Sequence, residues 1–82
     1  MSEPNFILKS VIYMVYRNGI LDKPFNTRLS AYNYTYNTAI KTKSCLFRSY
    51  SQVTRILRKD GKFIYTDSLN TTFVIQETNL YK

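Results

Sequence analysis

The sequence contains no histidine, no tryptophan, one cysteine and only two glycines among its 82 residues. Without histidine it lacks the commonest general acid and base. The single cysteine, Cys45, can form no intramolecular disulfide and has no histidine with which to share a metal, so a disulfide scaffold and a zinc module are excluded. Two isolated glycines form no phosphate-cradling loop. We therefore predict a protein that is not an enzyme and has no cofactor or metal.

Acidic residues are also scarce, and they are scattered along the chain. The five carboxylates stand at positions 3, 22, 60, 67 and 77, which gives no pair suited to acid–base catalysis. Asp60 and Asp67 bracket the short stretch "KFIYT", where turn formation explains them better than chemistry does.

Long apolar runs are absent as well. The longest, at 6–16, is interrupted by Lys9 and is shorter than the roughly 20 residues of a membrane-spanning helix. The upstream residues "MSEPN" are acidic and lack the basic start of a signal peptide. Since 44% of the residues are hydrophobic, we expect one small folded domain over 1–82, soluble and cytoplasmic, or in the host cytoplasm if the protein is viral. So small a core also makes a homodimer an expected assembly.

The net charge of +7 lies almost entirely in the middle of the chain. No acidic residue occurs between Asp22 and Asp60. The eight cations in that interval are Lys23, Arg28, Lys41, Lys43, Arg48, Arg55, Arg58 and Lys59. Like charges repel without counterions, so an unmixed block indicates that an external anion supplies the balance. This favours nucleic acid or another polyanion as the partner over a merely basic soluble domain.

Two segments fit either helix or strand. Residues 4–19 have Pro4 and Gly19 where a helix would begin and end, which favours a helix over 4–18, yet six consecutive apolar residues and an Asn18-Gly19 turn signal also fit a hairpin. Residues 26–43 show both a helical stripe and an alternating strand pattern, and both remain open. Tyr34 discriminates between the two structures. In a helix it projects away from the stripe, whereas in a strand it joins two other tyrosines on one face.

The pattern from residue 44 onward is clear. Apolar residues recur at offsets of 4, 3 and 4, and polar residues repeat these offsets two positions later, about 200° around a helix. The apolar set is Leu46, Tyr50, Val53 and Leu57, and the polar set is Arg48, Gln52, Arg55 and Lys59. We predict an α+β fold in which a basic amphipathic helix over about 45–59 ends at Asp60-Gly61 and precedes a β-hairpin at about 62–66 and 71–77.

The residues "SQVTRILR" at 51–58, followed by "GKFIY" at 61–65, resemble the recognition helix and wing of winged helix-turn-helix domains. The resemblance implies a nucleic-acid-binding role, with Arg48, Gln52 and Arg55 facing the major groove. The phosphate-binding residues would be Lys41, Lys43, Arg58, Lys59 and Lys62, with Arg28 on the flank. The middle segment is longer than the second helix of that family usually is.

A strand at 32–36 would imply a different nucleic-acid site. Tyr32, Tyr34 and Tyr36 would then offer three rings for stacking unpaired bases, between Arg28 and Lys41, which suits RNA or single-stranded DNA. The competing interpretation is that these tyrosines fill the core or a dimer contact.

Composition also bears on the biological setting. Phe, Tyr, Ile, Asn and Lys are abundant and Gly, Ala and Pro are rare, which resembles small accessory proteins of T4-like bacteriophages. We therefore expect a phage or viral regulatory or host-takeover factor that binds DNA or RNA. The alternative is an inhibitor of a host protein, such as a defence toxin or the transcription machinery, with RNA as one means of bridging the two proteins.

Overall fold

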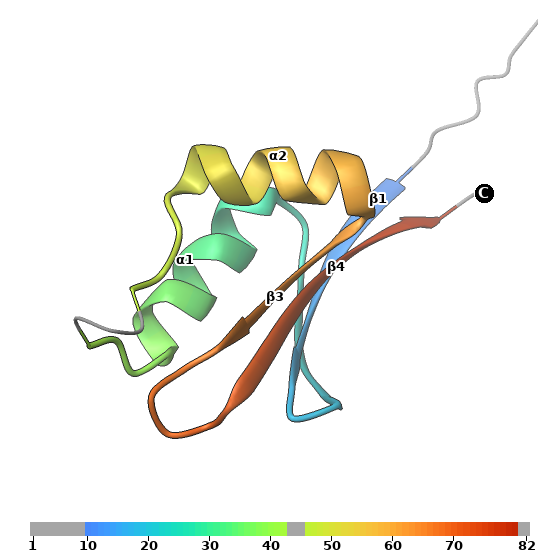
Figure 1. Ribbon diagram of the computed structural model, residues 1–82. Helices are drawn as coiled ribbons and strands as arrows, with labels where there is room; N and C mark the ends of the chain where they lie inside the picture. The colour runs from blue at the N-terminus through green and yellow to red at the C-terminus, as the bar shows by residue number, and fades with distance from the viewer. Residues whose placement is uncertain (1–9, 43–45, 81–82) are drawn as a thin grey trace, which may run out of the picture.

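The computed structural model describes residues 10–42 and 46–80 as a four-stranded sheet and two helices (Figure 1). The elements are β1 (Ser10–Arg17), β2 (Ile20–Phe25), α1 (Arg28–Thr38), α2 (Tyr50–Asp60), β3 (Lys62–Thr66) and β4 (Thr72–Leu80). The strands are antiparallel in the order β2-β1-β4-β3. The predicted α+β class is confirmed at this level.

The sheet joins the two ends of the described chain. β1 pairs with β4 along its whole length, from Ser10 opposite Leu80 to Arg17 opposite Phe73. Asn18 and Gly19 connect β1 to β2, with φ of 52° and 83°, the conformation that a tight two-residue hairpin turn requires. β1 and β4 are therefore central strands, and β2 and β3 are the edges.

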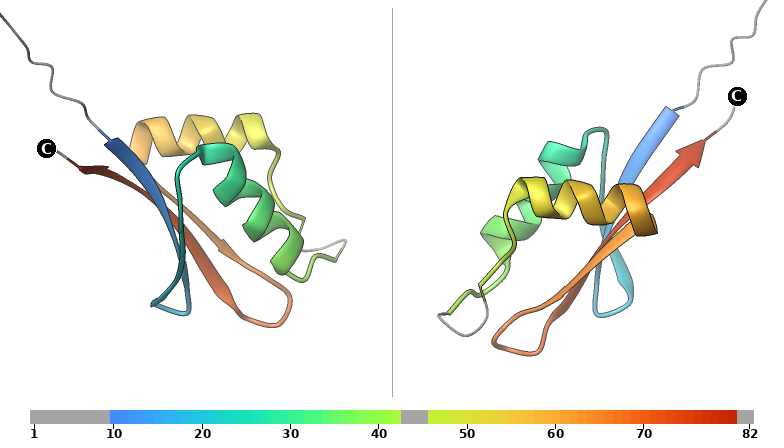
Figure 2. Two further views of the ribbon diagram at one scale, coloured as in Figure 1. Left: turned by 180° about the vertical axis from the view of Figure 1, so that it is seen from behind. Right: turned by 45° about the horizontal axis from the view of Figure 1, so that its top comes forward.

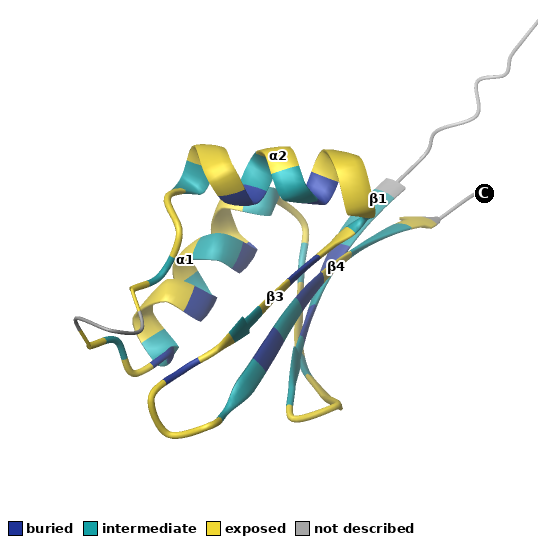
Figure 3. Cartoon of the chain, viewed as in Figure 1, coloured by how far each residue is buried: buried dark blue, intermediate teal, exposed yellow. Residues whose placement is uncertain are grey.

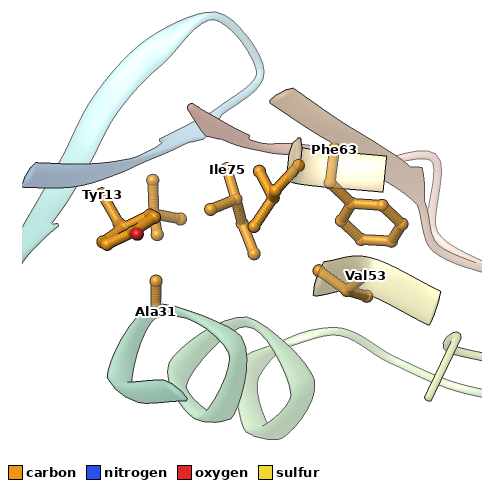
Figure 4. Close-up of a cluster of buried hydrophobic side chains, with 7 residues drawn as sticks. Tyr13, Ala31, Val53, Phe63 and Ile75 are labelled. Carbon is orange, nitrogen blue, oxygen red and sulfur yellow. The ribbon is translucent and has the colours of Figure 1, made fainter. Parts of the chain in front are cut away.

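Both helices lie on one face of the sheet, which Figure 2 shows from two further directions. Buried residues line the inner sides of the two layers, whereas the outward side of α2 is exposed (Figure 3). The sheet contributes Tyr13, Val15, Phe63 and Ile75, and the helices contribute Ala31, Val53 and Leu57. Figure 4 shows these side chains meeting between the layers. No helix in the described residues is long and apolar enough to cross a membrane.

The helix favoured for residues 4–18 is wrong over 10–17, where the chain forms β1. Tyr13 and Val15 point into the core, and the residues between them belong to the opposite face of the sheet. Burial alternates along this stretch because the helices cover one side of the sheet and not the other. Residues 1–9 lie outside the described part of the chain.

The ambiguous segment 26–43 contains helix α1. Thr27 caps its start, accepting a hydrogen bond from the Ser30 amide. Ala31, Thr35 and Ala39 recur at offsets of four and are buried, so a stripe of small residues faces the sheet and lets the helix approach closely. The strand alternative for residues 32–36 is therefore wrong.

The predicted hairpin is confirmed, with β3 at the expected residues and β4 starting one residue later and ending three residues later than expected. Asp67 lies in its turn and is buried. Its carboxylate accepts hydrogen bonds from the amides of Leu69 and Thr71, each at 2.9 Å, and of Ile40 at 3.1 Å. Burial opposes ionisation, but these three bonds hold the pKa of Asp67 below its usual value. Asp67 therefore fastens the hairpin turn to the end of α1.

Candidate nucleic-acid interface

Helix α2 is well defined at both ends. The Ser49 hydroxyl accepts a hydrogen bond from the Gln52 amide, and the Gln52 side chain accepts one from the Ser49 amide, which forms a capping box. Gly61 ends the helix with φ of 78°, a conformation that glycine adopts without strain. Val53 and Leu57 are buried against the sheet. The capping and burial fix which side of the helix faces solvent.

Three cations lie on that solvent side. Arg55, Arg58 and Lys59 are exposed. Arg55 and Lys59 follow Val53 and Leu57 by two residues, about 200° around the helix, and Arg58 lies one turn from Arg55. None of the three forms an ion pair or hydrogen bond within residues 10–42 and 46–80. The predicted cationic side of this helix is therefore present, and its charges have no partner in the described chain.

An open hollow of about 420 Å³ lies beside two of these cations. It is lined by Tyr50, Ser51, Thr54, Arg55 and Arg58. The Oγ1 atom of Thr54 is buried and has no hydrogen-bond partner in the described part of the chain. Guanidinium groups beside hydroxyl groups are donors suited to phosphate oxygens. The hollow therefore combines positive charge with neutral donors.

Two residues assigned to the groove-reading side take other positions. Arg48 precedes the N-cap residue and is exposed, so it lies at the end of the stripe and outside the helix. Gln52 is engaged in the capping box, which competes with reading a base. Leu46, expected on the apolar side of the helix, lies before it and is 71% exposed. The helix is shorter at its start than predicted because Ser49 is a strong N-cap residue.

The other predicted phosphate-binding cations do not join the α2 surface. Lys41 donates hydrogen bonds to the carbonyls of Tyr36 and Ala39 at the end of α1 and lies over the Tyr36 ring. Lys62 is exposed on β3, and its strand position faces away from the helices. Lys43 lies outside the described residues. The surface is therefore smaller than the sequence implied.

Arg28 is half-buried at the start of α1. Its guanidinium carbon lies 5.8 Å from the centre of the Tyr13 ring. Burial lowers the pKa of Arg28, but the hydroxyls of Tyr13 and Tyr50 more than offset this and raise it. Arg28 is therefore largely used inside the protein.

The three tyrosines of α1 separate into two groups. Tyr32 and Tyr36 stack at 5.9 Å, and both contact the ring of Phe47 in the connection between the helices. Tyr34 projects to the other side and packs against Phe25 at 5.3 Å. Three rings on one strand face are not formed, so the proposed base-stacking platform is wrong. Tyr32 and Tyr34 pack against the core, as the competing interpretation held, whereas Tyr36 is 42% exposed.

A polar cluster that the sequence analysis did not identify joins β1, β2 and α1. The Tyr34 hydroxyl donates to Asp22 at 2.5 Å, and Arg17 forms an ion pair with the same carboxylate at 2.8 Å. The hydrogen bond from Tyr34 lowers the pKa of Asp22, burial opposes this, and Arg17 lowers it further. The Asn18-Gly19 turn was the available signal, since a hairpin there brings Arg17 close to Asp22.

Within the described residues, no group of three or more acidic or cysteine side chains could hold a metal ion. Comparisons with protein-family models, with curated proteins and with solved structures found no match to this chain. The candidate interface therefore rests on its own geometry and charge.

Proposed function

We propose that this protein binds nucleic acid, without catalysing a reaction, through the exposed side of α2 and mainly through phosphate contacts. The observation that supports this most directly is the row formed by Arg55, Arg58 and Lys59, which has no partner in the described chain. Positive charge held in this way attracts the phosphate backbone of DNA or RNA irrespective of sequence.

The placement of the acidic groups supports the same proposal. Asp22 is paired with Arg17, and Asp67 is buried in its turn. Of the described carboxylates, only Asp60 lies on α2, and it occupies the last position. A phosphate that approaches the middle of the helix therefore meets no nearby acidic side chain on that helix.

The proposal takes α2 as the helix facing nucleic acid and β3–β4 as a flanking hairpin, as in winged-helix domains. Two features separate the chain from a standard helix-turn-helix. The connection from Ala39 to Ser49 is longer than the three or four residues usual in that motif, and a hairpin stands where a first helix was expected. Phosphate contacts, rather than base reading by Gln52, would thus provide most of the affinity. A regulatory role in a phage or virus fits the composition.

The test is charge reversal on α2. Arg55→Glu with Arg58→Glu removes two phosphate contacts and adds two repelling charges, so binding to a short duplex should be lost while thermal unfolding is unchanged. For the unmodified protein, three to four contacts predict a slope of about −3 in a plot of log affinity against log salt. Fluorescence anisotropy with a labelled duplex of about 12 base pairs, and with an RNA of matched length, measures both quantities.

The matched control is Lys23→Glu with Lys62→Glu, which changes net charge equally but at exposed positions off α2. The control should retain most of the affinity. Equal weakening by both pairs would mean that only overall charge matters, without a localised site. A salt slope near zero, together with capture of an acidic host protein by the unmodified chain, would favour the inhibitor alternative.

A further inference from the structure

The second face of the sheet is covered by neither helix (Figures 1 and 2). Side chains alternate along each strand, so the positions between the buried ones belong to this face. Its central positions are Ile12, Met14 and Tyr16 on β1, Val74 on β4, Ile64 on β3 and Leu21 on β2. Tyr16 contacts the Met14 sulfur at 3.7 Å, which confirms that these two share a side. We call this surface the open face.

The open face is apolar at its centre and almost uncharged. Ile64 is 55% exposed and Leu21 is 49% exposed, and the other central positions are partly exposed. The remaining positions, at its margin, carry Pro24, Thr66, Thr72, Gln76, Thr78 and one cation, Lys62. An apolar centre with methionine and tyrosine, inside a polar rim, is the composition of a protein–protein interface. One cation and one aromatic ring make a poor surface for nucleic acid.

We infer that the open face binds the open face of a second copy, so that the protein forms a two-fold symmetric dimer. The charge distribution selects this partner. Each copy carries +7, and like-charged copies repel least when they meet through their neutral sides. Sheet packing in this manner puts two layers of strands, one from each copy, between the two helical layers and directs both α2 helices outward. The inference stands independently of nucleic-acid binding.

The area of the open face sets the expected strength of the dimer. Strands about 4.8 Å apart, with about seven residues each at about 3.4 Å per residue, give a surface of roughly 19 by 24 Å. This is about 450 Å² in flat projection per copy, against about 800 Å² of accessible surface per partner in a standard interface. We therefore expect a reversible dimer that dissociates on dilution through the micromolar range.

The test measures mass by sedimentation and light scattering, on full-length protein treated with nuclease and shown by ultraviolet absorbance to be free of nucleic acid. The unmodified chain of 9.7 kDa should approach twice that mass as concentration rises. Leu21→Lys with Ile64→Lys should remain monomeric, because it places four charges in the dimer contact. A monomeric mass for the unmodified chain at every concentration would overturn the inference and leave the open face to another occupant.

The matched control is Ile20→Lys with Leu69→Lys. These residues are 73% and 69% exposed and lie off the open face, so this variant adds the same charge and should still dimerise. If the control dissociates as readily as the open-face variant, charge alone is responsible and the inference fails. The monomeric variant should keep its affinity for a short duplex. Failure of the dimer inference can therefore be distinguished from failure of the proposed nucleic-acid binding.

Cross-linking gives a second readout that does not depend on the lysine variants folding. In a Cys45→Ser background, Gln76→Cys places a thiol on the open face, on the central strand β4 and opposite Met14. Packed sheets lie about 10 Å apart, so a short bismaleimide should join two copies. Arg55→Cys, on the outer side of α2, should not cross-link. Cross-linking through Arg55→Cys alone would contradict the arrangement.

Discussion

The two helices have the same length and cover the same side of the sheet, yet they use their polar side chains in opposite ways. In α1, Tyr34 bonds to Asp22, and Arg28 packs over Tyr13. At the end of α1, Lys41 bonds to the helix carbonyls. In α2, Arg55, Arg58 and Lys59 contact nothing charged in the described chain. The difference is that the fold uses the cations next to α1 in internal contacts and leaves those of α2 without an internal partner in the described chain.

The largest expected effect comes from the buried side of α2. Leu57 is 1% exposed, so Leu57→Ala leaves a cavity and should lower the free energy of unfolding by about 2 to 4 kcal/mol. Leu46→Ala is the control, because Leu46 is exposed and precedes the helix, and it should cost less than about 0.5 kcal/mol. Urea titration measures both values. If both variants lost the same free energy of unfolding, Leu46 would have to lie on the apolar side of the helix, which would contradict the observed helix start.

A smaller effect is expected from the internal bonds of α1. Tyr34→Phe removes the hydrogen bond to Asp22 and should cost about 1 kcal/mol. Tyr36→Phe is the control, since Tyr36 is 42% exposed and its hydroxyl has no internal partner in the described residues. Thermal unfolding at neutral pH should separate the two variants.

The same pair of variants has a pH signature. The hydrogen bond from Tyr34, against burial and together with Arg17, lowers the pKa of Asp22 in the folded protein. The stabilisation is therefore fully present above the unfolded pKa of about 3.9 and is lost as pH falls through the lower folded value. The difference in melting temperature between the unmodified protein and Tyr34→Phe should narrow below about pH 4. A constant difference from pH 7 to pH 2.5 would mean that Asp22 is not coupled to Tyr34.

The smallest effect compares one cation from each region. Lys41→Gln loses the favourable contact of a charge with the end of α1 and should cost about 0.5 kcal/mol. Arg55→Gln should leave stability unchanged while weakening nucleic-acid binding several-fold. Melting curves and anisotropy titrations on both variants test the distinction. If Arg55→Gln lowered stability more than Lys41→Gln, Arg55 would have an internal partner and the proposed difference between the two helices would be wrong.

The fold was predictable where the pattern was local. The core of α2, its end at Gly61 and the strand at 62–66 follow from amphipathic spacing and turn residues. The strand β1 was not predictable in this way, because six consecutive apolar residues satisfy both periods. Its state is decided by pairing with β4, about 60 residues away in the chain. In α1, the buried stripe consists of small residues, so the larger tyrosines dominated the hydrophobic pattern of the sequence and left helix and strand unresolved.

The candidate site was predictable in charge but not in extent. A run without acidic residues indicated the cations, and spacing put Arg55 and Lys59 opposite Leu57, where the structure leaves both exposed. Spacing carried no information on which cations would be used internally, as Lys41 is, or would lie on the other face, as Lys62 does. Those assignments depend on the tertiary arrangement of the strands and helices.

The pairing of β1 with β4 at the centre of the sheet has a consequence for synthesis of the chain. Residues 10–66 supply five of the six elements, but the strand that joins the β1–β2 hairpin to β3 is residues 72–80. During translation, the N-terminal hairpin and both helices leave the ribosome before the strand that completes their shared core. The sheet therefore closes only after residue 80 emerges, through contacts distant in sequence, which makes folding slower than in a helical chain of this length.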